Sequence, residues 1–320
     1  MRLSIVSTLY RSAATIDEFC RRAFAAAAKI TSDIELVLVN DGSPDDSLER
    51  AVALHEADPR IVVVDLARNF GHHKAMMTGL AHATGDLVFL IDCDLEEEPE
   101  LLGMFFERLS GGRLDVVYGQ QEVRRGGLSE RFTGDLFFRL VNLLSDQSLP
   151  RNVITARLMT RAYVRALVRH RDREFLIAHL WAVTGFRQEG VTVTKHALSP
   201  TTYPIRRRIE MAVRHLTTNS TKLLYAIFYA GLLISLISAA VIVYFVLRYL
   251  LGGIGVEGWT SVIVSVWFFG GLLTLILGVL GIYLANVLSE TKRRPYTTVR
   301  QVHRRRDAAA AELASERDAS

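Results

Sequence analysis

The 320-residue sequence contains only two cysteines, Cys20 and Cys93, which lie far apart and form no Cys-x-x-Cys spacing. Their scarcity argues against a disulfide framework or structural zinc and fits a reducing compartment. Residues 1–215 also lack both glycine-rich phosphate-binding signatures, Gly-x-Gly-x-x-Gly and Gly-x-x-x-x-Gly-Lys-Ser/Thr. The turn after the first expected strand, residues 7–12, has no glycine at all. A nucleotide would therefore have to bind by another geometry.

Charged side chains are absent from two long stretches, residues 223–247 and 258–289. Each stretch exceeds the roughly 20 residues that a helix needs to cross a bilayer. A buried helix of a soluble protein is the alternative, but two such long consecutive runs argue against it. The sequence therefore predicts two transmembrane helices within residues 223–290.

Basic residues flank the expected spans on the sides nearest the chain ends. They are Arg206, Arg207, Arg208, Arg214 and Lys222 before the first span, and Lys292, Arg293, Arg294, Arg300, Arg304, Arg305 and Arg306 after the second. The connecting loop has only Arg248 and Glu257 near its ends. By the positive-inside rule we expect a multi-pass protein of the inner (plasma) membrane, with both termini and the first domain in the cytoplasm. No signal peptide is visible, since strand-like residues 3–6 follow the first two residues directly.

The net charge of +4 comes mostly from these juxtamembrane clusters. Such clusters attract anionic lipid headgroups, by about 1 kcal/mol per residue near the surface. Nucleic-acid binding is the rival explanation, but we expect no nucleic-acid partner, because the basic residues lack interleaved aromatic residues on the soluble domain. Residues 291–320 are predicted to form a basic cytoplasmic tail, disordered in the alanine-rich part after Arg306.

In the first 120 residues, apolar runs typical of strands alternate with helical patterns. The expected strands are residues 3–6, 34–39, 61–64, 87–91 and 115–118, and the helices between them include residues 47–56 and 73–83. This alternation predicts an α/β fold, with a mainly parallel sheet covered by helices on both faces. Thr15-x-x-Glu18 has the form of a capping box before the first helix. Pro99 suits the first turn of a helix that ends near Leu109.

Beyond residue 120 the pattern changes. Residues 124–127 form a basic, glycine-containing loop, and residues 132–144 and 205–216 each place apolar side chains on one helical face with arginines beside them. Amphipathic helices of this kind suit the membrane interface. For the first of them, packing on the domain core is equally consistent with the periodicity.

Asp92-Cys93-Asp94 follows the apolar strand at residues 87–91. In parallel α/β sheets, ligands bind just beyond the carboxyl ends of the strands. Two carboxylates there offer the hard oxygen ligands that Mg²⁺ or Mn²⁺ prefers, and such an ion usually holds substrate phosphates as well. Solvated turn residues are the alternative, because so short a motif also occurs by chance.

Several motifs follow one another in a recognisable order. They are the turn after the first strand, Val39-Asn40-Asp41-Gly42-Ser43, Arg68-Asn69-Phe70-Gly71, Asp92-Cys93-Asp94-Leu95 and Glu97-Glu98-Pro99-Glu100. In this order they resemble family 2 glycosyltransferases with the GT-A fold. Later segments resemble the polyprenyl-phosphate glycosyltransferases, which include dolichol-phosphate mannose synthase and the bactoprenol glucosyl transferases: Phe137-Phe138-Arg139-Leu140-Val141-Asn142, Arg157-Leu158-Met159, Gly185-Phe186-Arg187 and Gly281-Ile282-Tyr283-Leu284. The resemblance covers nearly the whole chain, and no single motif carries it.

The resemblance implies a nucleotide-sugar-binding GT-A core in residues 1–120 and an acceptor-side, juxtamembrane part of the same catalytic domain in residues 121–222. Asp92 and Asp94 would hold Mg²⁺ or Mn²⁺ on the donor diphosphate, with Asp94 the direct ligand and Asp92 contacting ribose or metal. Glu97 is a further candidate catalytic carboxylate, at the metal or at the acceptor. We expect Glu96 and Glu98 to be ordinary solvated acids.

The resemblance also implies a pocket for a UDP- or GDP-sugar. The residues expected at the nucleotide base are Thr8, Leu9, Tyr10, Asn40 and Asp41, and those expected near the diphosphate are Arg68, Asn69, Gly71 and Lys74. A simple turn is the alternative for residues 40–42. Because adjacent histidines cannot share one helical face, His72 and His73 are not expected to form a metal site together. We expect one of them to hydrogen-bond a sugar or phosphate oxygen and the other to lie at the surface.

The acceptor implied by the resemblance is polyprenyl phosphate, and the reaction an inverting transfer. A lipid phosphate is already ionised near neutral pH, so it needs cationic groups more than a general base. The candidates are Arg124, Arg125, Arg131, Arg139 and Arg157, of which Arg131 and Arg157 are preferred. Each of them could instead be an arginine that extends to the membrane interface.

The chain departs from the family pattern at three places. Tyr10-Arg11-Ser12 replaces Tyr-Asn-Glu, residues 152–156 replace a Gly-Asp, and Thr201-Thr202-Tyr203 replaces Ser-Lys-Tyr. These departures put the donor sugar in doubt more than the reaction class.

Two other functions stay open on the sequence. One is sugar transfer to the hydroxyl of a lipid-linked sugar or glycolipid, which would need a general base such as Asp92 or Glu97. The other is a non-catalytic membrane scaffold with a degenerate nucleotide-binding domain, against which the intact Asp92 and Asp94 argue. A homo-oligomer is also possible, because small residues in the expected spans allow close helix packing: Gly270, Gly271, Gly278 and Gly281.

Overall fold

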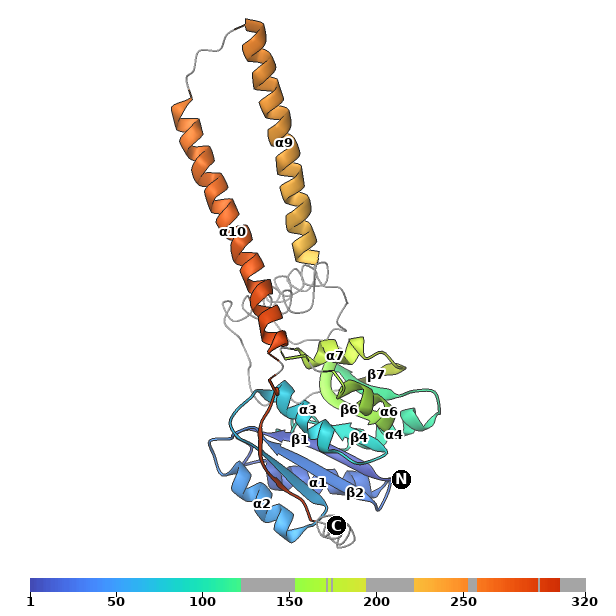
Figure 1. The fold of residues 1–320 in the computed structure, drawn as a ribbon. Helices are drawn as coiled ribbons and strands as arrows, with labels where there is room; N and C mark the ends of the chain where they lie inside the picture. The colour runs from blue at the N-terminus through green and yellow to red at the C-terminus, as the bar shows by residue number, and fades with distance from the viewer. Residues whose placement is uncertain are drawn as a thin grey trace, which may run out of the picture.

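The structure is a computed structural model that describes residues 1–121, 153–170, 172–173, 175–193, 222–252, 258–292 and 294–305. These residues form an α/β domain and two long helices, α9 (Lys222–Gly252) and α10 (Trp259–Thr291). The two helices project from the same side of the domain (Figure 1). The predicted amphipathic helices at 132–144 and 205–216 lie outside the described residues.

One sheet runs through the whole domain. Its strands are β1 (Leu3–Leu9), β2 (Ile34–Asn40), β3 (Ile61–Leu66), β4 (Leu87–Leu90), β5 (Val116–Gln121), β6 (Val153–Thr160), β7 (Gln188–Val193) and β8 (Val299–His303). They lie in the order β7-β5-β6-β4-β1-β2-β3-β8. The helices of the domain are α1 (Ile16–Ala28), α2 (Ser47–Ala57), α3 (His72–His82), α4 (Leu101–Ser110), α6 (Arg161–Leu167) and α7 (Ile177–Val183).

The first four strands are mutually parallel, which confirms the mainly parallel sheet expected from the sequence. Antiparallel β6 joins β4 to β5, and β7 pairs parallel with β5. The chain runs outward from β1 through β2 to β3 and then returns to place β4 on the opposite side of β1. This reversal makes β1 and β4 the switch point of the sheet, where ligands of such folds bind beyond the carboxyl ends of the strands.

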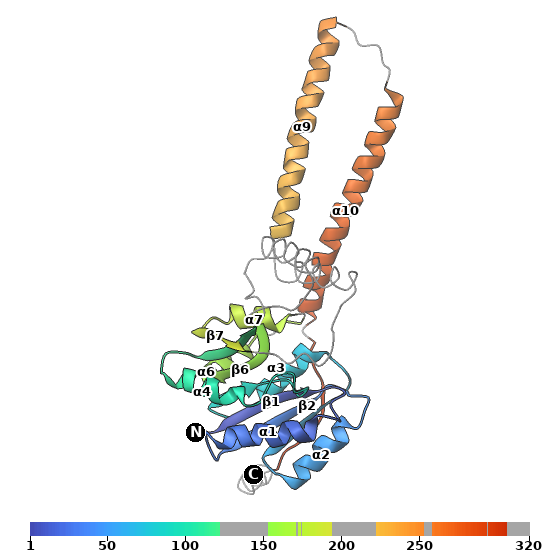
Figure 2. The ribbon, with the colours of Figure 1, turned by 180° about the vertical axis from the view of Figure 1, so that it is seen from behind.

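Both faces of the sheet are buried, which is why its central strands are apolar almost without interruption. Helices α1, α2 and α4 cover one face, against Ile5, Leu38 and Phe89 (Figure 2). Helices α3, α6 and α7 cover the other, against Val6 and Val39. The successive residues Ile5 and Val6 face opposite layers because side chains alternate along a strand.

Two local predictions are wrong in detail. Thr15 precedes α1, but its side chain makes no capping bond to the helix and instead donates a hydrogen bond to the Ser12 carbonyl at 3.3 Å. The expected capping box therefore does not form. Pro99 lies two residues before α4, outside its first turn, and Glu100 is the residue at the helix N-cap.

After α10 the chain returns to the sheet. No feature of residues 291–320 predicts a strand, yet Val299–His303 pairs antiparallel with β3 as an edge strand. Just before it, the Tyr296 ring packs on Phe175 with centroids 6.2 Å apart. The hydroxyls of Thr297 and Thr78 share a hydrogen bond of 2.8 Å. The chain thus leaves α10 and is held along the domain before it reaches β3.

Helices form over both of the uncharged stretches that the sequence shows. Among the described residues, one segment, Phe268–Leu288 in α10, is long and apolar enough to be a candidate membrane span, and none of it is buried in the protein. Helix α9 has 31 residues, but its described residues do not meet the same requirement of length and apolar composition. The prediction of two transmembrane helices is therefore not confirmed, although both helices are present.

Candidate active site

Four chain segments converge at the carboxyl ends of the parallel strands. Thr8 and Tyr10 lie at the end of β1, Asn40 ends β2, residues 67–71 follow β3, and residues 91–94 follow β4. Most of the residues predicted to bind the nucleotide sugar or the metal belong to these segments. The topology of the sheet therefore brings together motifs that are far apart in the sequence.

The loops after β2 and β3 are packed directly against each other. Gly42 has a φ of +59°, and a Cβ placed on it would lie 2.5 Å from the Asn69 backbone nitrogen, so no larger residue fits there. Asp41 joins the same loops, because its carboxylate accepts hydrogen bonds from the backbone N–H groups of Phe70 (2.7 Å) and Gly71 (3.1 Å). Burial raises the pKa of Asp41, although these two hydrogen bonds act in the opposite direction.

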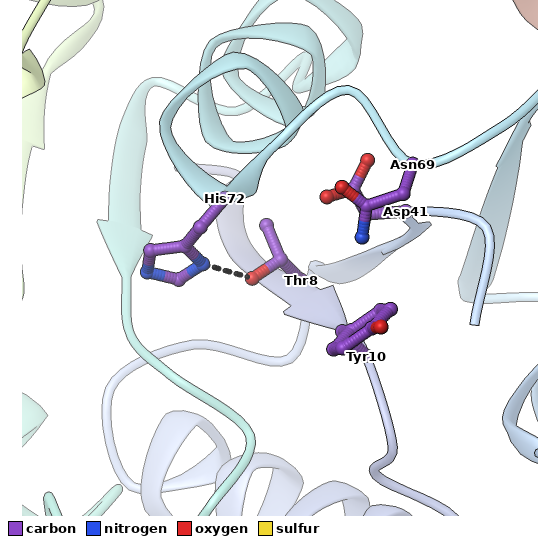
Figure 3. A pocket seen from close by; sticks show the side chains of 5 residues that line it. All are labelled: Thr8, Tyr10, Asp41, Asn69 and His72. Atoms are coloured by element: carbon purple, nitrogen blue, oxygen red, sulfur yellow. Dashed lines mark hydrogen bonds between the residues drawn. The ribbon is translucent and has the colours of Figure 1, made fainter. Parts of the chain in front are cut away.

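A cavity of about 290 Å³ opens between these loops and the first strand. Its lining residues, drawn in Figure 3, are Thr8, Tyr10, Asp41, Asn69 and His72. Four of the five are predicted donor-binding residues. The fifth, His72, belongs to the histidine pair, of which one member was expected to bind a sugar or phosphate oxygen.

His72 connects the first and fourth strands across the switch point. Its Nδ1 lies 3.0 Å from the Thr8 hydroxyl, and its Nε2 lies 3.3 Å from Asp92 Oδ1 (Figure 3 shows the Thr8 contact). Partial burial alone would lower the pKa of His72, but the hydrogen bond and negative charge of Asp92 outweigh it and raise the pKa. The imidazole thereby lies between the end of β1 and one carboxylate of the Asp-x-Asp pair.

His73 has different surroundings. Burial, and then the positive charge of His72, lower the pKa of His73 to about 4, so its ring is neutral at pH 7. The two rings are 6.0 Å apart between centroids and point to different partners, with His73 near the Phe175 backbone. The expectation that the two histidines do not share a metal is not tested by this arrangement. His72 is exposed, with 48% of its side chain accessible, and His73 is half-buried, so which of the two binds a ligand stays a prediction.

Asp92 and Asp94 lie in the segment that follows β4. The Asp92 side chain is 17% exposed, and the exposed Asp94 accepts a hydrogen bond from the Glu96 backbone at 2.9 Å. Leu95 has a φ of +61°, which is unfavourable for a branched residue and of the kind often found where function fixes the backbone. The described residues contain no group of three or more side chains arranged to hold a metal ion. Two carboxylates nevertheless fit Mg²⁺ or Mn²⁺, because such ions commonly complete their coordination with water and substrate phosphates.

Glu97 is buried, with 1% of its surface exposed. Its two carboxylate oxygens accept hydrogen bonds from the backbone N–H groups of Thr155 (3.1 Å) and Ala156 (2.7 Å). In this structure Glu97 therefore attaches the loop after β4 to strand β6. Its predicted catalytic role is not tested by this arrangement and stays a prediction.

Arg157 is the one predicted acceptor-phosphate residue among the described residues, and it is 1% exposed. Its guanidinium lies over the Trp181 ring and donates hydrogen bonds to the carbonyls of Ile154 and Thr155, both at 3.3 Å. Burial lowers the pKa of Arg157 to about 9, and the nearby charge of Glu97 opposes this shift. Arg124, Arg125, Arg131 and Arg139 lie outside the described residues. Binding of the acceptor by these five residues stays a prediction.

The remaining predicted donor residues differ in their exposure. The Leu9 side chain is buried in the core, and only its carbonyl, which accepts the Asp41 backbone N–H at 3.0 Å, belongs to the site. Arg68 is exposed and stacks over Phe70, with its Cζ 4.1 Å from the ring centroid. Gly71 precedes α3 with a φ of +99°, and Lys74 lies in the first turn of that helix.

A second cavity, of about 440 Å³, lies on the other side of Asn69 towards β3. Its lining includes the predicted residues Asn40, Arg68 and Asn69, together with Asp65 and Arg300, which have no predicted role. Asp65 could have been found from the sequence, because it is an acid at the end of an apolar strand, as Asp92 is. Arg300 gives no such signal, since only the pairing of β8 with β3 places it there.

Comparisons with known proteins agree with one another. A model of the family described as "Glycosyl transferase family 2" matches residues 4–171. The chain is 49% identical, over 95% of its length and 89% of the relative's, to a protein of Mycobacterium tuberculosis (strain CDC 1551 / Oshkosh) named "Putative glycosyltransferases". It is 31% identical, over 94% of each chain, to an uncharacterized glycosyltransferase of Bacillus subtilis (strain 168). It is 28% identical to a prophage bactoprenol glucosyl transferase homolog of Escherichia coli (strain K12), over 94% of this chain and 99% of that one.

Proposed function

Because the chain belongs to glycosyl transferase family 2, we propose that this glycosyltransferase moves a sugar from UDP- or GDP-sugar to polyprenyl phosphate at the cytoplasmic face of a membrane. One observation carries the proposal: the loops after β1, β2 and β3 surround a cavity whose His72 also holds Asp92 of the Asp-x-Asp pair. The similarity to a bactoprenol glucosyl transferase homolog over 94% of the chain supports the lipid acceptor.

Each part of the site would have a role in the proposed sugar transfer. The nucleoside of the donor would lie against Tyr10, Asn40 and Asn69, with its diphosphate directed towards Asp92 and Asp94. A divalent cation, Mg²⁺ or Mn²⁺, held by these two carboxylates would stabilise the charge that develops on the departing nucleoside diphosphate. A phosphate oxygen of the lipid would attack the anomeric carbon from the face opposite the diphosphate. The new C–O bond forms as the old one breaks, so the configuration at that carbon inverts.

The path of the chain supports two membrane crossings. It leaves the catalytic domain into α9 and returns from α10 into the same sheet through β8. In both ribbon views the two helices extend side by side away from the domain (Figures 1 and 2). If both helices cross the membrane, both chain ends must lie on one side of it. The basic clusters next to the helices favour the cytoplasmic side.

A hydroxyl acceptor makes a further demand on the site. It would need a general base within reach of the acceptor proton. Both Glu97 oxygens already accept backbone N–H groups, and Asp92 is paired with His72. A lipid phosphate needs no such base, because it is already an anion.

The proposal is tested by nucleotide release from the purified full-length protein in detergent. UDP- and GDP-sugars are offered with Mn²⁺ and with polyprenyl phosphate, a glycolipid that has a free hydroxyl, or no lipid. We expect release of one nucleotide that requires polyprenyl phosphate, with a sugar-bearing lipid phosphate as the product. Release only with the glycolipid would show that the acceptor is a hydroxyl group and not the lipid phosphate. No release with any combination would contradict the proposed reaction.

A further inference from the structure

Arg300 interrupts the pairing of the last strand. Gln301 lies opposite Asp65 and Val299 opposite Leu66, so Arg300 is one extra residue without a partner on β3. Such a bulge turns the side chain of the extra residue away from its regular direction, and bulges are common beside active sites. Here the bulge directs an arginine towards the carboxyl end of β3, the end of the sheet on which the candidate site is built.

The Arg300 side chain joins a row of polar groups that leads into the site. Its Nη1 lies 3.4 Å from Asp65 Oδ2, and its Nη2 donates a hydrogen bond to the Ala67 carbonyl at 2.8 Å. The other oxygen of the buried Asp65 accepts a hydrogen bond from the Asn40 side-chain amide at 2.8 Å. The orientation of Asn40, a predicted donor-binding residue, therefore depends on Asp65, whose charge Arg300 balances.

Arg300 also faces open space that a ligand could fill. It lines the cavity of about 440 Å³ together with Asn40, Arg68 and Asn69, and Asn69 also lines the cavity that contains His72. The Arg300 side chain is 60% exposed. A guanidinium has five N–H donors, and the two contacts to Asp65 and Ala67 leave others for acceptor oxygens of a ligand.

We propose that Arg300 is a donor-binding residue, which β8 brings to the nucleoside end of the sugar nucleotide. Its guanidinium donates hydrogen bonds to a base carbonyl or a ribose oxygen and holds Asp65 and Asn40 in place beside it. This inference rests on the proposed function. Because α10 ends at Thr291 and Arg300 follows shortly after it, the donor pocket is complete only when the chain has returned from α10 and paired with β3.

Arg304 offers a matched control on the same strand segment. It also pairs with a buried carboxylate, Glu35, at 3.2 Å, and it donates a hydrogen bond to the His82 carbonyl at 2.7 Å. Neither partner lines either of the two cavities. Loss of Arg304 therefore weakens the attachment of the chain end to the domain without altering the nucleoside end of the proposed pocket.

The test is calorimetric titration of UDP and GDP, with Mn²⁺ present, into the full-length protein and into Arg300→Gln, Arg300→Lys and Arg304→Gln variants. We expect Arg300→Gln to raise the Kd of the preferred nucleotide about tenfold, or about 1.4 kcal/mol. Arg300→Lys keeps the charge but not the planar fork, so we expect a smaller rise. Arg304→Gln should lower the melting temperature at least as much as Arg300→Gln but leave the Kd within about twofold.

Each outcome separates this inference from the proposed function. If the wild-type protein binds nucleotide and Arg300→Gln binds it equally well, the inference is wrong and the proposed function stands. If Arg304→Gln weakens nucleotide binding as much as Arg300→Gln, attachment of the strand is the cause, and the inference is again wrong. A wild-type protein that binds neither nucleotide would overturn the proposed function and this inference together.

Discussion

Replacing Asp94 by Asn should lower kcat/KM for sugar transfer by about a thousandfold or more while leaving the protein folded. The amide can still accept the hydrogen bond from the Glu96 backbone, so the loop after β4 keeps its conformation. The negative charge that would hold the divalent cation is lost. Metal stabilisation of a leaving group contributes several kcal/mol, and each 1.4 kcal/mol of barrier changes the rate about tenfold. Initial rates of nucleotide release, at saturating and limiting donor, measure the effect.

Glu98→Gln is the control for this substitution. It removes one negative charge from the same acidic segment, at a residue that has no proposed contact with metal or donor. Glu98 is half-buried, and because the amide keeps the size of its side chain, we expect the activity to stay within about twofold of wild type. If Asp94→Asn kept more than about a tenth of the wild-type kcat/KM, Asp94 could not be the direct metal ligand.

Glu97→Gln should lower the free energy of unfolding by about 1–3 kcal/mol, the usual penalty when a buried hydrogen-bond donor loses its acceptor. Both carboxylate oxygens accept backbone N–H groups of β6. In the glutamine side chain one of these oxygens becomes an NH₂ group, which is a donor and cannot accept the backbone N–H that it faces. The buried Arg157 would also lose the negative charge near it. A denaturant titration of the full-length protein in detergent, followed by circular dichroism, measures the loss.

This experiment also distinguishes the two roles of Glu97. A carboxylate that chiefly attaches β6 to the loop after β4 predicts a large loss of stability. A carboxylate that acts on metal or acceptor predicts wild-type stability and lost activity. Glu98→Gln again serves as control, and we expect its unfolding free energy within about 0.5 kcal/mol of wild type. Equal stability of Glu97→Gln and wild type would show that the two hydrogen bonds to Thr155 and Ala156 are not the main use of Glu97.

The sequence predicts those parts of the site that depend on local signals. An acid at the end of an apolar strand identifies Asp92, and alternating strands and helices identify the sheet edge at which it lies. The same sequence cannot predict partners that only the assembled sheet brings together. In the sequence, Glu97 is one of several acids in a loop. Only the folded structure shows that β6 places two backbone N–H groups against it.

Strand β8 is another part of the structure that the sequence does not predict. Val299–His303 is short and largely exposed, so it has little of the apolar pattern that marks the central strands. Its position depends on tertiary contacts, among them Arg304 with the buried Glu35 and Thr297 with Thr78. Likewise, His72 and His73 are indistinguishable in sequence. Only the packing of α3 on the face of the sheet, over β1 and its neighbouring strands, decides that His72 meets Thr8 and Asp92.

The most direct test of the account is whether nucleotide binding depends on a metal held by Asp94. UDP and GDP are titrated by calorimetry into the wild-type protein and into Asp94→Asn, each with Mn²⁺ and each with EDTA. We predict that the wild-type protein binds one of the two nucleotides at least about tenfold more tightly with Mn²⁺, and that Asp94→Asn binds it weakly under both conditions. Nucleotide affinity that is the same with Mn²⁺ and EDTA, or a metal effect unchanged in Asp94→Asn, would show that Asp94 holds no metal at the donor site.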